Sequence, residues 1–164
     1  MNVIHTKFHV TKESLKEFRS RGKEIAFLRI EGATDSDRAQ ALQQAYDFLG
    51  RVYDIPTLFT QAIYILSGKR IWIGPTGRDA ERVVVCSELV GWCYQKFFPK
   101  PWKLTPDDIV RNRDTNFIDE KDIQPGDIGV EHTFFNPLGH PLSILSVLIR
   151  VFTRSHWNHS FILV

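Results

Sequence analysis

The sequence predicts an α+β fold in one domain that covers residues 1–164. A chain of 164 residues can bury one core, and no repeat or linker divides it. Hydrophobic residues make up 43% and charged residues 24%, a globular composition that excludes a disordered or fibrous chain. Segments with helical periodicity dominate the first two thirds of the chain, whereas strand-like segments occupy both ends. This separation is typical of α+β proteins.

The N-terminal part of the chain reads as two strands and two helices. Residues 3–10 alternate loosely and predict a strand, as do residues 24–30 (EIAFLRI). Residues 11–20 predict a short charged helix between them. A capping cluster at residues 34–36 starts another helix, which Gly50 would end as a left-handed cap.

The middle of the chain predicts three more helices. An apolar helix runs from Pro56 to about residue 66, and a turn follows at residues 74–77. Positions 86, 89, 90, 93 and 97 carry apolar or thiol side chains on one face of a helix that Pro99 ends. Thr105 caps a third helix, with proline at its first position and acids in its first turn.

The C-terminal part ends in strands. The turn at residues 124–127 leads into a short strand over 128–131, and the last four residues read as a buried strand. Residues 142–152 fit a helix or a buried strand equally well. Residues 107–131 hold eight of the 19 acids and predict a solvated face.

Charge and hydropathy exclude several classes of protein. Twenty-one Lys and Arg residues against 19 Asp and Glu leave a net charge of +2, too little for a general nucleic-acid binder. The first 25 residues are rich in charge and lack an apolar run, so we expect no cleavable signal. The longest apolar stretch, residues 142–152, is too short to span a bilayer. We therefore expect a soluble protein that is cytoplasmic as synthesised.

Cys86 is the first candidate for chemistry. It opens a helix directly after three valines, where backbone N–H groups and the helix dipole would lower the pKa of its thiol. Burial as a small hydrophobic residue is the competing interpretation. Cys93 lies about 10 Å along the same helix, too far for a disulfide, and reads as packing.

A cysteine nucleophile needs a base, and His159 is the histidine best placed to serve. It begins an apolar strand after a polar turn, and alternation puts His159, Phe161 and Leu163 on one face. A surface histidine at a strand edge remains the alternative.

Three motifs resemble the NlpC superfamily of papain-like cysteine hydrolases. Residues 83–90 (VVVCSELV) resemble its nucleophile helix, most closely that of the YiiX-like branch. Residues 124–128 (QPGDI) resemble its turn into the first core strand. Residues 152–155 (FTRS), followed by 157–159 (WNH), resemble the segment that carries the base. The stretch 26–54 is similar to the region before the nucleophile in the YiiX-like branch. This resemblance implies a papain-like, NlpC-type fold in which the nucleophile helix packs on an antiparallel sheet.

The order of the motifs differs from that of the YiiX-like branch, where the histidine precedes the cysteine. Here Cys86 precedes His159, and the strand expected after His159 resembles residues 3–6 (VIHT) instead. The resemblance therefore implies a circular rearrangement with the N- and C-terminal strands adjacent. His5 would orient the base, and His9 is the fallback because it has the same strand parity.

The resemblance implies a cysteine peptidase or amidase with Cys86, His159 and His5 as catalytic residues. Its substrate would be an amide, most typically a peptide bond in peptidoglycan, and Trp157 and Ser87 are the expected substrate-binding residues. Because we expect no cleavable signal, the protein would reach a cell wall only by another route. An ester or acyl-lipid hydrolase or acyltransferase with the same residues is one alternative. A non-catalytic binding module in which Cys86 is merely packed is another. We predict no cofactor and no metal, because His156 and His159 form only an i,i+3 pair without a nearby Cys or carboxylate.

Overall fold

The computed structural model describes residues 1–6, 9–20, 24–53, 83–101, 104–132, 156–157 and 159–164. In sequence order, the elements of these residues are β1 (Asn2–Thr6), β2 (Val10–Ser14), α1 (Leu15–Arg19), β3 (Glu24–Ile30), α2 (Asp35–Asp47), β4 (Val52–Tyr53), β5 (Val83–Val84), α4 (Cys86–Cys93), α5 (Pro106–Arg111), β6 (Thr115–Ile118), the 3₁₀ helix η3 (Glu120–Asp122), β7 (Ile128–His132) and β8 (His159–Leu163). The α+β prediction is confirmed at this coarse level.

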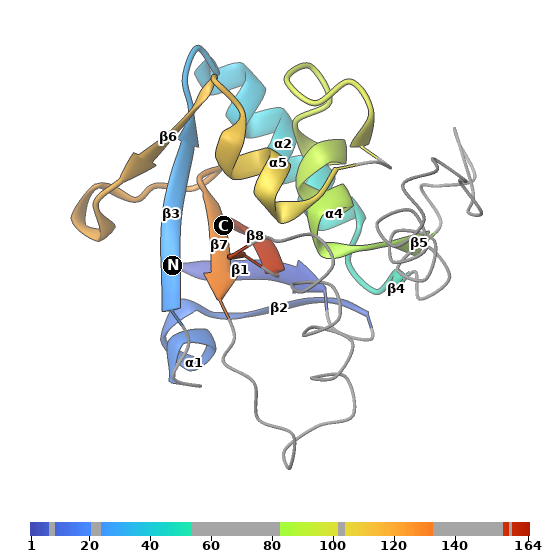
Figure 1. Ribbon diagram of the computed structural model, residues 1–164. Helices are drawn as coiled ribbons and strands as arrows, with labels where there is room; N and C mark the ends of the chain where they lie inside the picture. The colour runs from blue at the N-terminus through green and yellow to red at the C-terminus, as the bar shows by residue number, and fades with distance from the viewer. Residues whose placement is uncertain (7–8, 21–23, 54–82, 102–103, 133–155, 158) are drawn as a thin grey trace.

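A six-stranded antiparallel sheet organises the molecule, in the order β2-β1-β8-β7-β3-β6. The strand nearest the C-terminus, β8, lies between β1 and β7. Backbone hydrogen bonds of 2.9 and 2.8 Å join Asn2 and Val164 in both directions. The first and last strands of the described chain are therefore direct neighbours, as Figure 1 shows.

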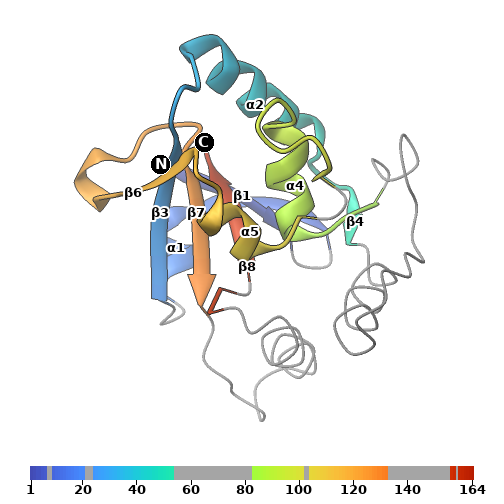
Figure 2. The same ribbon diagram turned by 45° about the horizontal axis from the view of Figure 1, so that its top comes forward.

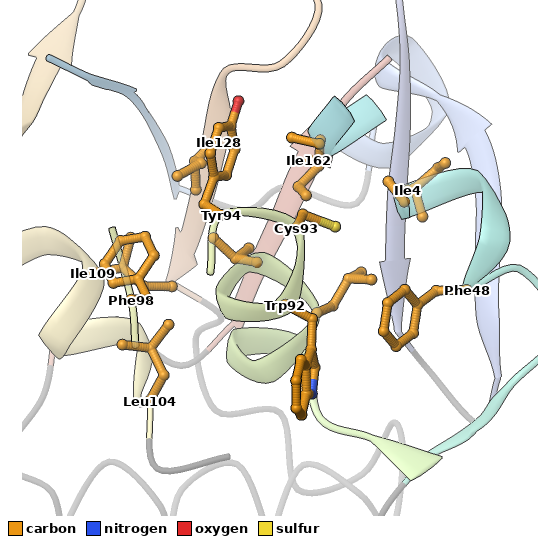
Figure 3. Close-up of a cluster of buried hydrophobic side chains, with 14 of the residues drawn as sticks. Ile4, Phe48, Trp92, Cys93, Tyr94, Phe98, Leu104, Ile109, Ile128 and Ile162 are labelled. Carbon is orange, nitrogen blue, oxygen red and sulfur yellow. The ribbon is translucent and has the colours of Figure 1, made fainter. Parts of the chain in front are cut away.

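Helices cover the two faces of the sheet unequally. Helices α2, α4 and α5 lie on one face, which we call the α4 face, and α1 lies on the other, the α1 face (Figures 1 and 2). Ile4, Ile128 and Ile162 point to the α4 face, where they meet side chains from α4 and α5 (Figure 3). Phe161 and Leu163 point to the α1 face and pack with Phe18. Alternation along β8 thus supplies both cores.

Several predicted elements are confirmed close to their expected bounds. Strand β3 covers the predicted residues 24–30, and α5 begins at Pro106 after the Thr105 cap. Gly50 has a φ of +82°, the left-handed conformation expected after α2. Each of these signals is local, because it depends on a few consecutive residues.

Other elements differ from their prediction. Residues 11–14 belong to β2 instead of the start of a helix, since pairing with β1 overrides their helical propensity. Helix α4 ends at Cys93, whereas the sequence predicted that it would continue to Pro99. Strand β6 was not predicted. The predictions for residues 56–77 and 142–152 lie outside the described residues.

The turn before β7 is fixed by an ion pair. Arg29 donates to both carboxylate oxygens of Asp127 at 2.8 and 2.7 Å, and the backbone N–H of Gln124 donates to the same carboxylate. Asp127 is only 1% exposed, so one of the acids expected on a solvated face is buried instead. The contact ties β3 to the start of β7.

Across the described part of the chain, the helices are all too short or too polar to traverse a lipid bilayer.

Candidate active site

Cys86 is the first residue of α4 and follows β5 after a single residue. The side chain of Glu88 accepts a hydrogen bond of 3.1 Å from the backbone N–H of Val85, the residue that caps the helix. Glu88 is 2% exposed, so this contact is shielded from water. It explains why a helix can begin abruptly at the cysteine.

Cys86 is 5% exposed, and the helix that it opens packs against β8. Burial raises the pKa of Cys86 to about 11, and the negative charge of Glu131 also raises it. The backbone N–H and hydroxyl of Ser160, together with the backbone N–H of Ser87, lower it by favouring the thiolate. The expectation of a lowered pKa is wrong for this structure, because burial outweighs the helix-end donors.

His159 and His5 meet on the α1 face. Their ring centroids are 5.6 Å apart in an edge-to-face arrangement, and both rings contact Phe18. His5 is 1% exposed, and its Nε2 lies 2.6 Å from Oε1 of Glu13 on β2. A carboxylate thus holds His5 against His159 in a fixed orientation.

Cys86 lies beside Ser160, the residue that follows His159 in β8. Ser160 borders the thiol from the α4 face, whereas the His159 ring stacks with Phe18 of the α1 face. Cys86 and His159 therefore both lie near the start of β8, but on opposite faces of the sheet. Strands β1 and β8 pair only at Val3↔Leu163 and Ile4↔Ile162, so their ladder stops before it reaches His159.

Glu131 is a buried residue of this region that the sequence analysis did not single out. It lies opposite His159 in the β7–β8 pair and is 1% exposed. Directly paired residues in a sheet project to the same face, so Glu131 shares the α1 face with His159. One sequence signal could have identified Glu131. It is a carboxylate near the end of an apolar strand, two residues after Gly129 and therefore on the same face.

The two expected substrate-binding residues are engaged with the protein. Ser87 is 2% exposed, and its hydroxyl donates to the backbone carbonyl of Leu104. Trp157 is half-buried against the core of the α4 face and contacts the His156 ring edge-on, with centroids 4.9 Å apart. A substrate role for either side chain stays a prediction.

The structure separates the remaining cysteine and histidine candidates. Cys93 is buried in the core of the α4 face, as expected of a packing residue (Figure 3). Neither cysteine is in a disulfide. His9 is exposed and takes part in an isolated bridge with Val52, so His5 is the histidine of the pair that reaches His159.

Comparison with known proteins gave no match to a family model, to a curated protein or to a solved structure. The resemblance to papain-like hydrolases therefore depends on the motifs alone.

A second group of polar residues lies at the same end of β7, where His132 directly follows Glu131. Glu24 of β3 pairs with His132 of β7, and its Oε2 is 3.2 Å from Nδ1 of His132 and 3.3 Å from Nε2 of His156. The ligand-type atoms of these three residues all lie within 4.8 Å of one another. Among the described residues, this is the group able to hold a metal ion. Its members come from three separate segments, so no local sequence motif could reveal it.

Proposed function

We propose that the protein is a cysteine hydrolase that cleaves an amide bond, with Cys86 as nucleophile and His159 as base. The observation that carries this proposal is that α4, which begins at Cys86, packs against β8, which begins at His159. His5 orients His159, and Glu13 in turn holds His5 at 2.6 Å. Such a series of nucleophile, base and orienting group is the general arrangement of covalent hydrolases.

The buried thiol decides how the reaction would begin. Because burial raises the pKa of Cys86 to about 11, the resting residue is a neutral thiol at pH 7. His159 lies on the α1 face and Cys86 on the α4 face, so the imidazole has to turn around the start of β8 to reach the sulfur. It then takes the proton as the sulfur attacks the carbonyl carbon, and a tetrahedral oxyanion forms. In this proposal the oxyanion accepts a hydrogen bond from the backbone N–H of Cys86, which is the first residue of α4.

Collapse of the intermediate completes the first half of the reaction. The C–N bond breaks, and His159 returns its proton to the leaving amine, which leaves a thioester on Cys86. Water then attacks the thioester while His159 accepts a proton. The C–S bond breaks, a carboxylic acid is released, and the thiol is restored.

The proposed substrate class is a peptide amide of the kind found in peptidoglycan. This choice follows from the resemblance to the NlpC superfamily. An ester or acyl-lipid substrate would use the same residues, so substrate assays have to include both bonds.

The first test is hydrolysis of muropeptides, short acyl amides and acyl esters by the wild type and by Cys86→Ser. We expect amide hydrolysis to fall by about 10³-fold or more in Cys86→Ser and in His159→Ala. Cys93→Ser and His9→Ala are the matched controls and should retain the wild-type rate. A wild-type rate in Cys86→Ser would refute the nucleophile assignment, and hydrolysis of esters alone would select the alternative substrate.

A second test measures iodoacetamide alkylation from pH 5 to 9, with both cysteine peptides mapped by mass spectrometry. His159→Ala should slow labelling of Cys86 near pH 7, because the base that accepts the thiol proton is gone. Labelling of Cys93 provides the internal standard for unfolding in each sample.

A papain-like binding module without catalysis is the competing function, and the 5% exposure of Cys86 is the observation that favours it. On that hypothesis, Cys86 is alkylated only when the protein unfolds, at the same denaturant concentration as Cys93. No substrate of the panel would then be turned over.

A further inference from the structure

We propose that Glu24, His132 and His156 form a binding site for a divalent metal ion, and that Zn²⁺ is the ion that fits best. The site is separate from the proposed hydrolase residues and does not depend on their activity. It lies where β3 begins, where β7 ends and where the chain approaches β8.

The two distances from Glu24 suit metal ligands as well as long hydrogen bonds. A carboxylate oxygen and an imidazole nitrogen, each about 2.0–2.1 Å from a tetrahedral Zn²⁺, lie about 3.3–3.4 Å apart. Oε2 of Glu24 is 3.2 Å from Nδ1 of His132 and 3.3 Å from Nε2 of His156. Both separations exceed the roughly 2.7–2.9 Å of a charge-assisted N–H···O⁻ bond.

The backbone fixes two of the three ligands in advance. Glu24 and His132 are paired across the β3–β7 ladder, so their side chains leave the same face of the sheet side by side. The His132 side chain is only 6% exposed, which limits its freedom. A site whose ligands are already oriented loses less entropy when it binds an ion.

The third ligand arrives from the segment before β8. The ring centroids of His132 and His156 are 4.2 Å apart, and the two ring planes are tilted by 31° to each other. His156 also contacts Trp157, which packs against the core of the α4 face. The neighbouring tryptophan therefore supports the ring of His156 from the side.

The donor set selects the class of ion. Two neutral imidazoles and one carboxylate suit borderline cations such as Zn²⁺, whereas Mg²⁺ and Ca²⁺ prefer oxygen ligands alone. Three protein ligands leave the fourth tetrahedral position for water or another donor. The bound ion would hold His156, three residues before β8 begins, close to the start of β3 and the end of β7.

The test is Zn²⁺ binding by the metal-stripped full chain, measured by competition with a chromophoric chelator. We expect one ion per chain and an affinity at least about tenfold lower in Glu24→Gln and in His156→Gln. Both side chains are about half exposed, at 52% and 53%, so neither substitution should prevent folding. His9→Gln is the control for loss of a histidine, and Cys86→Ser is the control for binding to the thiol; both should retain the wild-type affinity.

A second measurement uses the wild type alone. Zn²⁺ should shift the imidazole nitrogen resonances of His132 and His156 and leave those of His9 in place. Failure of the wild type to bind Zn²⁺, or equal affinity in Glu24→Gln and His156→Gln, would overturn the proposal. Loss of binding in Cys86→Ser would instead assign the ion to the thiol.

Discussion

Opposing effects act on the thiol of Cys86. Removal from water raises its pKa to about 11, and the carboxylate of Glu131 adds to the rise. Donors from Ser160 and Ser87 reduce the rise without reversing it. The result is a residue that stays protonated until a base accepts its proton. Its reactivity therefore depends on a few neighbours that can be changed one at a time.

Removal of the Ser160 hydroxyl should make the thiol harder to ionise. Ser160→Ala deletes one donor that favours the thiolate, so the pKa of Cys86 rises further and alkylation at fixed pH slows by about fivefold. The rate constant of Cys86 alkylation at pH 8, with Cys93 as internal standard, measures this effect. An unchanged rate would mean that the hydroxyl does not act on the sulfur.

Neutralisation of Glu131 should have the opposite effect. The carboxylate raises the pKa of Cys86 through its charge, so Glu131→Gln should lower that pKa and speed alkylation at pH 8. Glutamine has nearly the same shape, which keeps the β7–β8 packing intact. Slower alkylation in this variant would contradict the electrostatic argument.

At the residue scale, only the local features of the candidate site could be predicted from the sequence. The position of Cys86 at the start of a helix and of His159 at the start of a strand could be predicted, because each follows from adjacent residues. The burial of the thiol and the pairing of Glu131 with His159 could not, because both depend on how β7, β8 and α4 pack together. The catalytic roles themselves stay predictions until the variants are assayed.

At the scale of single elements, β7 and β8 pack closely because Gly129 of β7 has no side chain where the ring of Phe161 of β8 lies. A Cβ atom built on Gly129 would lie 2.0 Å from Cζ of Phe161, so the phenyl ring occupies the space that any other residue would need. Phe161 is fully buried and its ring lies 4.6 Å from that of Phe18. The α1 face is therefore packed around a ring that lies across the neighbouring strand.

Gly129→Ala should destabilise the fold by about 1–3 kcal/mol, because the ring of Phe161 has to move. Chemical denaturation of the wild type, both single variants and the double variant with Phe161→Leu measures this cost. In the double variant the alanine should cost less, since leucine is smaller at that point. Additive costs would show that the two residues do not interact.

The elements differ in how well local signals specify them. Strand β3 was predicted with its true bounds because an apolar run marks it, and the start of α5 was predicted because a cap and a proline mark it. Strands β2 and β6 were missed. Both lie at the edges of the sheet and carry exposed polar residues. Their conformation is therefore decided by pairing with a neighbouring strand, β1 for β2 and β3 for β6, and not by a local pattern.

At the scale of the whole molecule, the sheet order predicts how stability is distributed. Strands β8 and β7 are central and have helices over the α4 face, whereas β2 and β6 are the two edges. Amide hydrogens of β8 and β7 should therefore exchange more slowly with solvent deuterium than those of β2 and β6. Hydrogen exchange followed by mass spectrometry tests this, and equal rates in β8 and β2 would contradict the described topology.

The place of β8 between β1 and β7 has a consequence for the newly made chain. Until residues 159–163 leave the ribosome, β2-β1 and β7-β3-β6 are two separate pieces with unpaired edges facing each other. Unpaired edges attract other strands, so this interval exposes the nascent protein to mispairing. Because β8 also carries His159 and Ser160, the candidate site forms in the same late event that closes the sheet.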